Sequence, residues 1–117
     1  MQKEDFLRRT RAFGLRVIHL VESLPKNQTA QILGRQLLRA GTSVGVNYRA
    51  AVRGKSRADF IAKMGIVEEE CDEAIYWIEM LVDSGSVKSS AIADLIDEGN
   101  QILSIVVASI KTARRGK

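Results

Sequence analysis

The chain is poor in the residues that cross-link chains, interrupt helices or build sheets. It has one cysteine, one proline and 5% aromatic residues among 117. A single cysteine excludes an internal disulfide and suits a reducing compartment, so we expect a cytoplasmic protein. The scarcity of proline and aromatic residues argues against an all-β fold. No apolar run approaches the roughly 20 residues of a membrane span, and residues 1–10 lack the apolar core of a secretory signal, so we expect neither a membrane nor secretion.

The chain also lacks the residue groups on which most catalytic sites depend. Its one histidine, His19, has no second histidine or cysteine at a metal-ligand spacing, and Cys71 lies on an apolar helical stripe. Gly54-Lys55-Ser56 resembles the end of a phosphate-binding loop, but Arg49 stands where that motif needs its first glycine. We therefore expect no enzyme, no catalytic or metal-binding residue and no cofactor.

What the chain does have is a three-four repeat of apolar residues, which is typical of amphipathic helices. The repeat occupies four segments, near residues 4–24, 28–53, 57–84 and 89–114. Pro25, Gly54 and Gly85 separate them, and Ser56 is a suitable N-cap with Asp59 completing an imperfect capping box. Four amphipathic helices with short connections predict an all-α protein, an up-down antiparallel four-helix bundle with residues 1–117 in one domain.

The second segment also contains polar and small residues on or beside its apolar stripe. Asn47 lies between Val44 and Ala51 at a position that faces other helices. A buried asparagine needs hydrogen-bond partners, so we expect a structural role in fixing the register of the helices. Gly41 and Gly45 weaken a helix, and close approach of a neighbouring helix would offset that cost.

Charge is distributed very unevenly, although the net charge is only +4. Residues 24–57 contain seven cations and no acid, whereas residues 58–84 contain eight acids and one cation. Such a molecule can attract copies of itself, a polyanion, or both.

Four arginines of the second segment form a stripe on the side opposite its apolar face. They are Arg35, Arg39, Arg49 and Arg53, and they fall within about 80° of one another on a helix. The planar guanidinium group binds phosphate or carboxylate groups through two parallel hydrogen bonds. The stripe could be a solvated face, a source of salt bridges between subunits, or a contact for nucleic acid. As nucleic-acid-binding candidates we take these four arginines together with Arg8, Arg9 and the tail residues Lys111, Arg114, Arg115 and Lys117.

The third segment offers the complementary surface. Four of its acids, Glu68, Asp72, Glu79 and Asp83, fall within about 60° of one another. Tyr76 lies on the same side and Trp77 flanks the apolar stripe, and aromatic residues beside charges are typical interface anchors. We therefore expect a subunit interface that includes Tyr76, Trp77, Glu68, Asp72 and Glu79.

Most of the chain also resembles a known family. The residues that carry the resemblance are Gln36-Leu37-Leu38-Arg39-Ala40, Ser43-Val44, Asn47, Ser56-Arg57-Ala58-Asp59-Phe60-Ile61, Ile66-Val67-Glu68-Glu69-Glu70, Tyr76-Trp77 and the tail Ser109 to Arg115. They resemble the four-helix bundle proteins encoded in intervening sequences of bacterial 23S rRNA genes. One departure is Ala50, where the family usually has a glutamate.

The resemblance implies a homopentameric ring of bundles with no defined activity. It also implies a relationship to retroelement accessory proteins, which bind nucleic acid and a reverse transcriptase. Together these observations predict a non-enzymatic, cytoplasmic homo-oligomer that binds RNA or DNA through basic surfaces, and that has a partner protein. The alternative is a protein–protein interaction scaffold with no nucleic-acid role.

Overall fold

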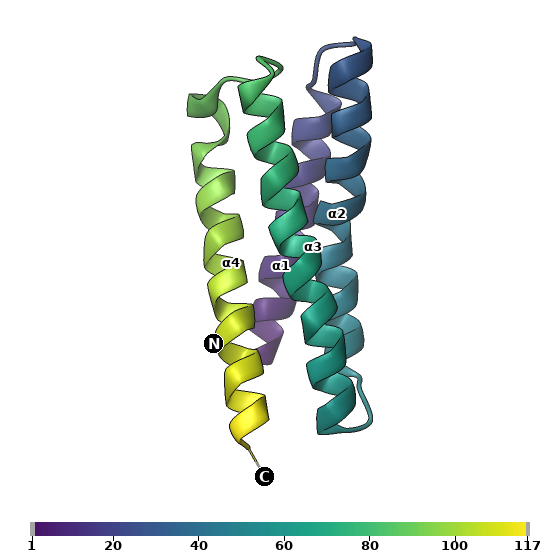
Figure 1. Ribbon diagram of the computed structural model, residues 1–117, viewed down its shortest axis with the longest axis vertical. Coiled ribbons are helices and arrows are strands. Elements are labelled where there is room, and N and C mark those ends of the chain that lie inside the picture. Colours follow the sequence, from purple (N-terminus) through teal and green to yellow (C-terminus); the bar gives the residue numbers. More distant parts are fainter. Residues whose placement is uncertain (1, 117) are drawn as a thin grey trace.

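Four antiparallel helices form a bundle about 50 Å long and about 20 Å wide (Figure 1). The computed structural model describes residues 2–116. Its helices are α1 (Lys3–Glu22), α2 (Gln28–Val52), α3 (Arg57–Asp83) and α4 (Ser89–Arg115). Over these residues there is no strand, and each helix begins and ends within two residues of its predicted limits. The predicted all-α, up-down four-helix bundle is therefore confirmed.

Local capping interactions explain where the two central helices begin and where α3 ends. The side chain of Asn27 accepts a hydrogen bond from the N–H of Ala30, and that of Ser56 accepts one from the N–H of Asp59. These bonds satisfy N–H groups that the first turn of a helix leaves free. α3 ends at Gly85, which has a left-handed φ of 81°. Its N–H and that of the next residue bond back to α3 carbonyls, which closes the helix as a Schellman motif.

The four apolar stripes meet in one core along the axis of the bundle. Its largest fully buried side chains are Phe13, Leu37, Met64, Ile78, Leu81 and Ile102. Tyr48 is also buried, with its ring edge-to-face against Phe6 at a centroid distance of 4.7 Å. Asn47, beside it, is only half-buried and donates to the carbonyl oxygen of Ser43 in its own helix. The aromatic ring, and not the amide, thus makes the contact between helices at this level.

α1 and α2 approach closely because glycines line their contact. A Cβ atom at Gly41 would lie 2.8 Å from both methyl carbons of Val17, and one at Gly45 would lie 3.4 Å from the carbonyl oxygen of Thr10. The two glycines therefore allow α1 and α2 to pack closely, and this packing offsets the cost of glycine inside a helix. The hydroxyl of Thr10 is buried here and donates to the carbonyl oxygen of Phe6.

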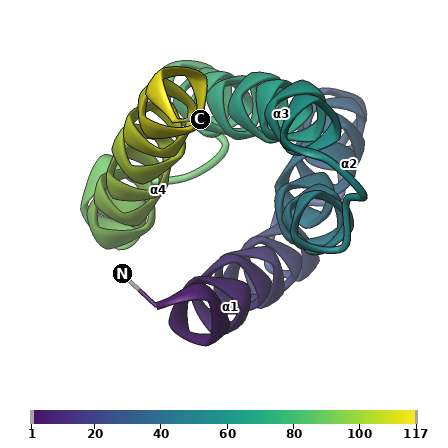
Figure 2. The ribbon, with the colours of Figure 1, turned by 90° about the horizontal axis from the view of Figure 1, so that it is seen from below.

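The helices follow one another around the core in chain order, so α1 and α4 are the first and last (Figure 2). These two contact each other less than the other adjacent pairs do. Arg9 of α1 bridges them, donating two hydrogen bonds to Glu98, at 2.6 and 2.9 Å, and one to Gln101. Phe13 reaches towards α4 as well, where Gly99 leaves room for its ring.

Candidate nucleic-acid interface

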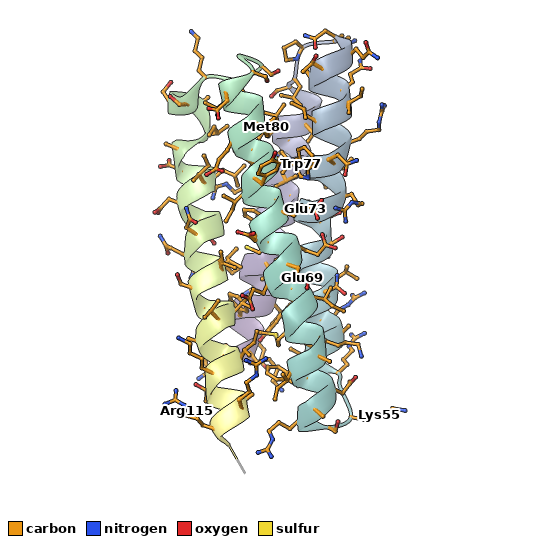
Figure 3. The ribbon with its side chains drawn as sticks, viewed as in Figure 1. Lys55, Glu69, Glu73, Trp77, Met80 and Arg115 are labelled. Atoms are coloured by element: carbon orange, nitrogen blue, oxygen red, sulfur yellow. The ribbon has the colours of Figure 1, made fainter. Side chains whose placement is uncertain are left out.

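Cations gather at one end of the bundle because the topology brings two separate basic segments there. The up-down order places the α2–α3 connection and the C-terminus of α4 at the same end, and Figure 3 shows Lys55 and Arg115 at that end. We call this surface the basic end. It consists of Arg53, Lys55, Arg57, Lys111, Arg114 and Arg115, all of which are exposed. Lys117, the remaining tail residue of the sequence prediction, lies outside the described residues.

Acids near the basic end do not cancel its charge. Glu4 and Asp5 begin α1 on this side, and Asp5 forms an ion pair with Arg8. Asp59 accepts a hydrogen bond from Lys63 at 2.8 Å. That bond is the main reason why the pKa of Asp59 lies below its ordinary value. Two of these three acids therefore already have their own cations.

The opposite end of the bundle carries no such excess. Its two connections and the residues that flank them contribute two acids, Glu22 and Asp83, and two cations, Lys26 and Lys88. All four side chains are exposed. The two ends of the bundle therefore differ, and only the basic end has an excess of cations.

The arginine stripe predicted on α2 divides into two parts. Arg39 is engaged within its own protomer, since it forms ion pairs with Glu70 and Glu73 of α3. Hydrogen bonds to Glu73 and then to Glu70 raise the pKa of Arg39 above its ordinary value. Arg35, Arg49 and Arg53 are exposed, and none of the three has an ion-pair partner within residues 2–116. Arg53 belongs to the basic end, so it lies at the same end of the bundle as the predicted tail residues.

The predicted interface residues of α3 lie on two sides of that helix. Trp77 is half-buried on the side of α2, where its indole N–H donates to Glu73 at 3.0 Å. This bond, followed by the one from Arg39, lowers the pKa of Glu73. Tyr76 is 51% exposed, and its ring stands edge-to-face against Trp77 at 5.0 Å. Glu73 and Trp77 lie one turn apart along α3 in Figure 3.

The acids Glu68, Asp72 and Glu79 lie on the other side of α3, towards α4. Glu68 and Asp72 line a groove with α4, and Glu79 lines a second groove nearer the α3–α4 connection. None of the three has an ion-pair partner within the described part of the chain. They are therefore available to a partner, whereas Glu70 and Glu73 are occupied by Arg39.

Two residue types of the described part of the chain, potential metal ligands and the cysteine, were candidates for reactive groups. The described residues contain no group of three or more histidine, cysteine or acidic side chains that could hold a metal ion. Cys71 is buried and its Sγ lies 3.4 Å from the carbonyl oxygen of Gly99. Burial, more than the nearby Asp72 and Glu98, raises the pKa of its thiol to about 12, which suppresses the nucleophilic thiolate.

No helix over the described part of the chain has the length and apolar character needed to cross a bilayer.

Sequence reasoning missed Lys55 and Arg57 as members of the basic end. The predicted topology could have shown this, because an up-down bundle places the α2–α3 connection at the same end as the C-terminus of α4. It also missed that Glu70 and Glu73 would neutralise Arg39. That pairing depends on the register of two antiparallel helices, which their sequences do not specify separately.

Comparisons with known proteins agree with this architecture. The model of the family described as 23S rRNA-intervening sequence protein matches residues 2–108. A crystal structure of a protein with unknown function from the S23 ribosomal protein family of Bacteroides thetaiotaomicron is similar, with 30% sequence identity and a TM-score of 0.88. That similarity covers 95% of this chain and 99% of the other. No curated protein matches significantly. With a family match over most of its length and a matching fold, the chain belongs to the 23S rRNA-intervening sequence protein family.

Proposed function

We propose that this protein is a non-enzymatic homo-oligomer that binds RNA or DNA through its basic end. The observation that carries the proposal is the clustering of six exposed cations, from two segments far apart in sequence, at one end of the bundle. Exposed lysine and arginine side chains bind phosphates and release counterions, which supplies affinity without base recognition. A single exposed tyrosine, Tyr76, offers little surface for base stacking. The expected mode is therefore backbone recognition that is largely independent of sequence.

Assembly would strengthen this binding. The family resemblance favours a ring of five bundles, and a ring with parallel bundles would present every basic end on the same rim. Weak phosphate contacts repeated around a rim combine into a much higher overall affinity. A cytoplasmic location and a partner protein belong to the same proposal, and the reduced, buried Cys71 suits a reducing compartment.

A fluorescence titration of a labelled single-stranded RNA, and of a duplex DNA, tests the proposal. The test variant combines Lys55→Glu with Arg115→Glu, one substitution in each segment of the basic end. The matched control combines Lys26→Glu with Lys88→Glu, which changes the net charge equally at the opposite end. Affinity should fall at least tenfold in the test variant and much less in the control.

Equal losses in both variants would mean that only net charge matters and would refute a localised site. No binding by the wild-type protein would refute the nucleic-acid role altogether. Circular dichroism and light scattering on both variants show whether the fold and the assembly are unchanged.

The second candidate is a protein–protein interaction scaffold without a nucleic-acid role. It is favoured by one observation, the engagement of Arg39 with Glu70 and Glu73, which shows that basic side chains of α2 can be neutralised by protein carboxylates. If the wild-type protein assembles but binds neither RNA nor DNA in the titration, the scaffold becomes the better account.

A further inference from the structure

The outer surface between α1 and α2 carries an apolar groove edged with arginines. We call it the arginine groove and define it by its apolar residues Leu15, Ile18 and Val46 and its cations Arg8, Arg11 and Arg49. Leu15 is 46% exposed and Val46 is 54% exposed, and both are large apolar side chains in contact with solvent. The groove is next to the glycine contact of α1 and α2, where small side chains leave the surface hollow.

The arginines of this groove are not all engaged within the protomer. Arg8 pairs with Asp5 one turn earlier. Arg11 and Arg49 are exposed and have no ion-pair partner within residues 2–116. A surface that combines exposed apolar residues with free guanidinium groups suits a partner that has apolar residues and carboxylates.

The same chain has a surface of that kind between α3 and α4. We call it the acidic groove, and it consists of Gly65, Glu68, Glu69, Asp72, Leu103 and Val107. Leu103 and Val107 are only partly buried and provide its apolar floor. Its three acids have no ion-pair partner within the described residues. The two grooves are therefore complementary in charge, and both contain exposed apolar surface.

The two grooves also overlap in their position along the bundle. Thr10 of α1 and Gly45 of α2 both line the arginine groove and lie against each other. Gly45 therefore gives the position of this groove along α2. Arg39, six residues earlier on α2, pairs with Glu70 on α3. Antiparallel helices rise by the same distance per residue but in opposite directions. Gly45 lies six residues after Arg39 on α2, so the α3 residue beside it lies six residues before Glu70, and this residue is Met64. Gly65, the next residue, is one end of the acidic groove, so the two grooves overlap along the bundle. Figure 3 places Glu69, inside this groove, near the middle of α3.

The grooves face different directions, because α1–α2 and α3–α4 form different sides of the bundle (Figure 2). A contact between two different surfaces of identical chains is heterologous and generates a closed ring or an open chain. A ring whose axis runs along the bundles requires the two surfaces to overlap in their position along that axis.

We infer that the arginine groove of one protomer binds the acidic groove of a second copy, with Arg11 nearest to Glu69 and with Arg49 at the edge of the contact. The inference rests on the proposed homo-oligomer and assigns its interface. It places the basic partner at the seam between α1 and α2, and Arg49 is the one residue that this seam shares with the predicted α2 stripe. It leaves the basic end outside the interface, so assembly and nucleic-acid binding use separate surfaces.

Charge-reversal variants of the whole chain, measured by sedimentation velocity, test this pairing. Variant one carries Arg11→Glu and Arg49→Glu, and variant two carries Glu69→Lys and Asp72→Lys. All four positions are exposed, so the fold should survive, and thermal unfolding checks this. Each variant should sediment as a monomer of 12.9 kDa. A third variant carrying all four substitutions exchanges the charges of both grooves and should regain the wild-type assembly.

The outcomes separate this inference from the proposed function. If variants one and two keep the wild-type mass, or if the four-fold variant stays monomeric, the grooves do not bind each other and the inference is wrong, while the proposed oligomer stands. If the wild-type protein is itself a monomer at micromolar concentration, the proposed oligomer fails as well. The Lys55→Glu and Arg115→Glu variant should keep the wild-type mass, and its dissociation would place the interface at the basic end and overturn the assignment.

Discussion

Gly41 and Gly65 both lie inside helices, yet replacing each by alanine should change stability in opposite directions. At an exposed helical position this replacement stabilises a protein by about 1 kcal/mol. A Cβ at Gly65 meets nothing within 4 Å, so the full gain should appear there. A Cβ at Gly41 would lie 2.8 Å from both methyl carbons of Val17. Valine has essentially one rotamer in a helix, so relief requires backbone movement, and overpacking of this kind costs about 1–3 kcal/mol.

The free energy of unfolding in urea, followed by circular dichroism, measures both effects. Gly41→Ala should lower it by up to about 2 kcal/mol after the propensity gain is subtracted, and Gly65→Ala should raise it by about 1 kcal/mol. In a Val17→Ala background the penalty of Gly41→Ala should largely disappear, because the colliding methyl groups are gone. Several protein concentrations are needed, since Gly65 lies in the acidic groove and assembly would add its own stability. A Gly41→Ala protein that is more stable than the wild type by about 1 kcal/mol, as expected for Gly65→Ala, would refute the close contact of α1 and α2.

Three other predictions concern single side chains. Arg9→Met should destabilise the bundle by about 1–3 kcal/mol in urea unfolding, because it leaves the partly buried Glu98 carboxylate without its donor. Cys71, with a pKa raised to about 12, should react with iodoacetamide far more slowly in the native protein than in urea, and equal rates would contradict its burial. The pKa of Glu73 is lower in the folded state than in the unfolded state. Ionised Glu73 therefore stabilises the fold at a pH above its unfolded pKa of about 4.3, and this stabilisation is lost as the pH falls through its folded pKa. Glu73→Gln should therefore make stability less dependent on pH in the acidic range, and an unchanged pH profile would contradict this.

The elements of this fold could be predicted because their determinants are local. The three-four apolar repeats mark the helices, and Ser56 and Gly85 mark a beginning and an end through bonds to residues no more than five positions away. The family resemblance rested on the same local patterns, and the family match confirmed it.

The surfaces were harder to predict because they depend on how helices are placed against one another. On a helical wheel, Arg39 lies only about 40° from Arg35, yet the register of α2 against α3 gives only Arg39 two carboxylate partners. Asn47 was predicted to be buried and to fix the register of the helices, but its side chain is half-buried and bonds within α2, whereas the neighbouring Tyr48 is buried. The arginine groove combines residues of two helices, and no single segment reveals it.

The salt dependence of RNA binding tests the central claim most directly. The dissociation constant of the wild-type protein should rise steeply with salt. On a logarithmic plot, Lys55→Glu with Arg115→Glu should reduce the slope by about 0.7 for every phosphate of single-stranded RNA that a protomer no longer neutralises. The Lys26→Glu and Lys88→Glu control should retain the wild-type slope. Equal slopes in all three proteins would show that the basic end does not bind phosphates, and would contradict the account.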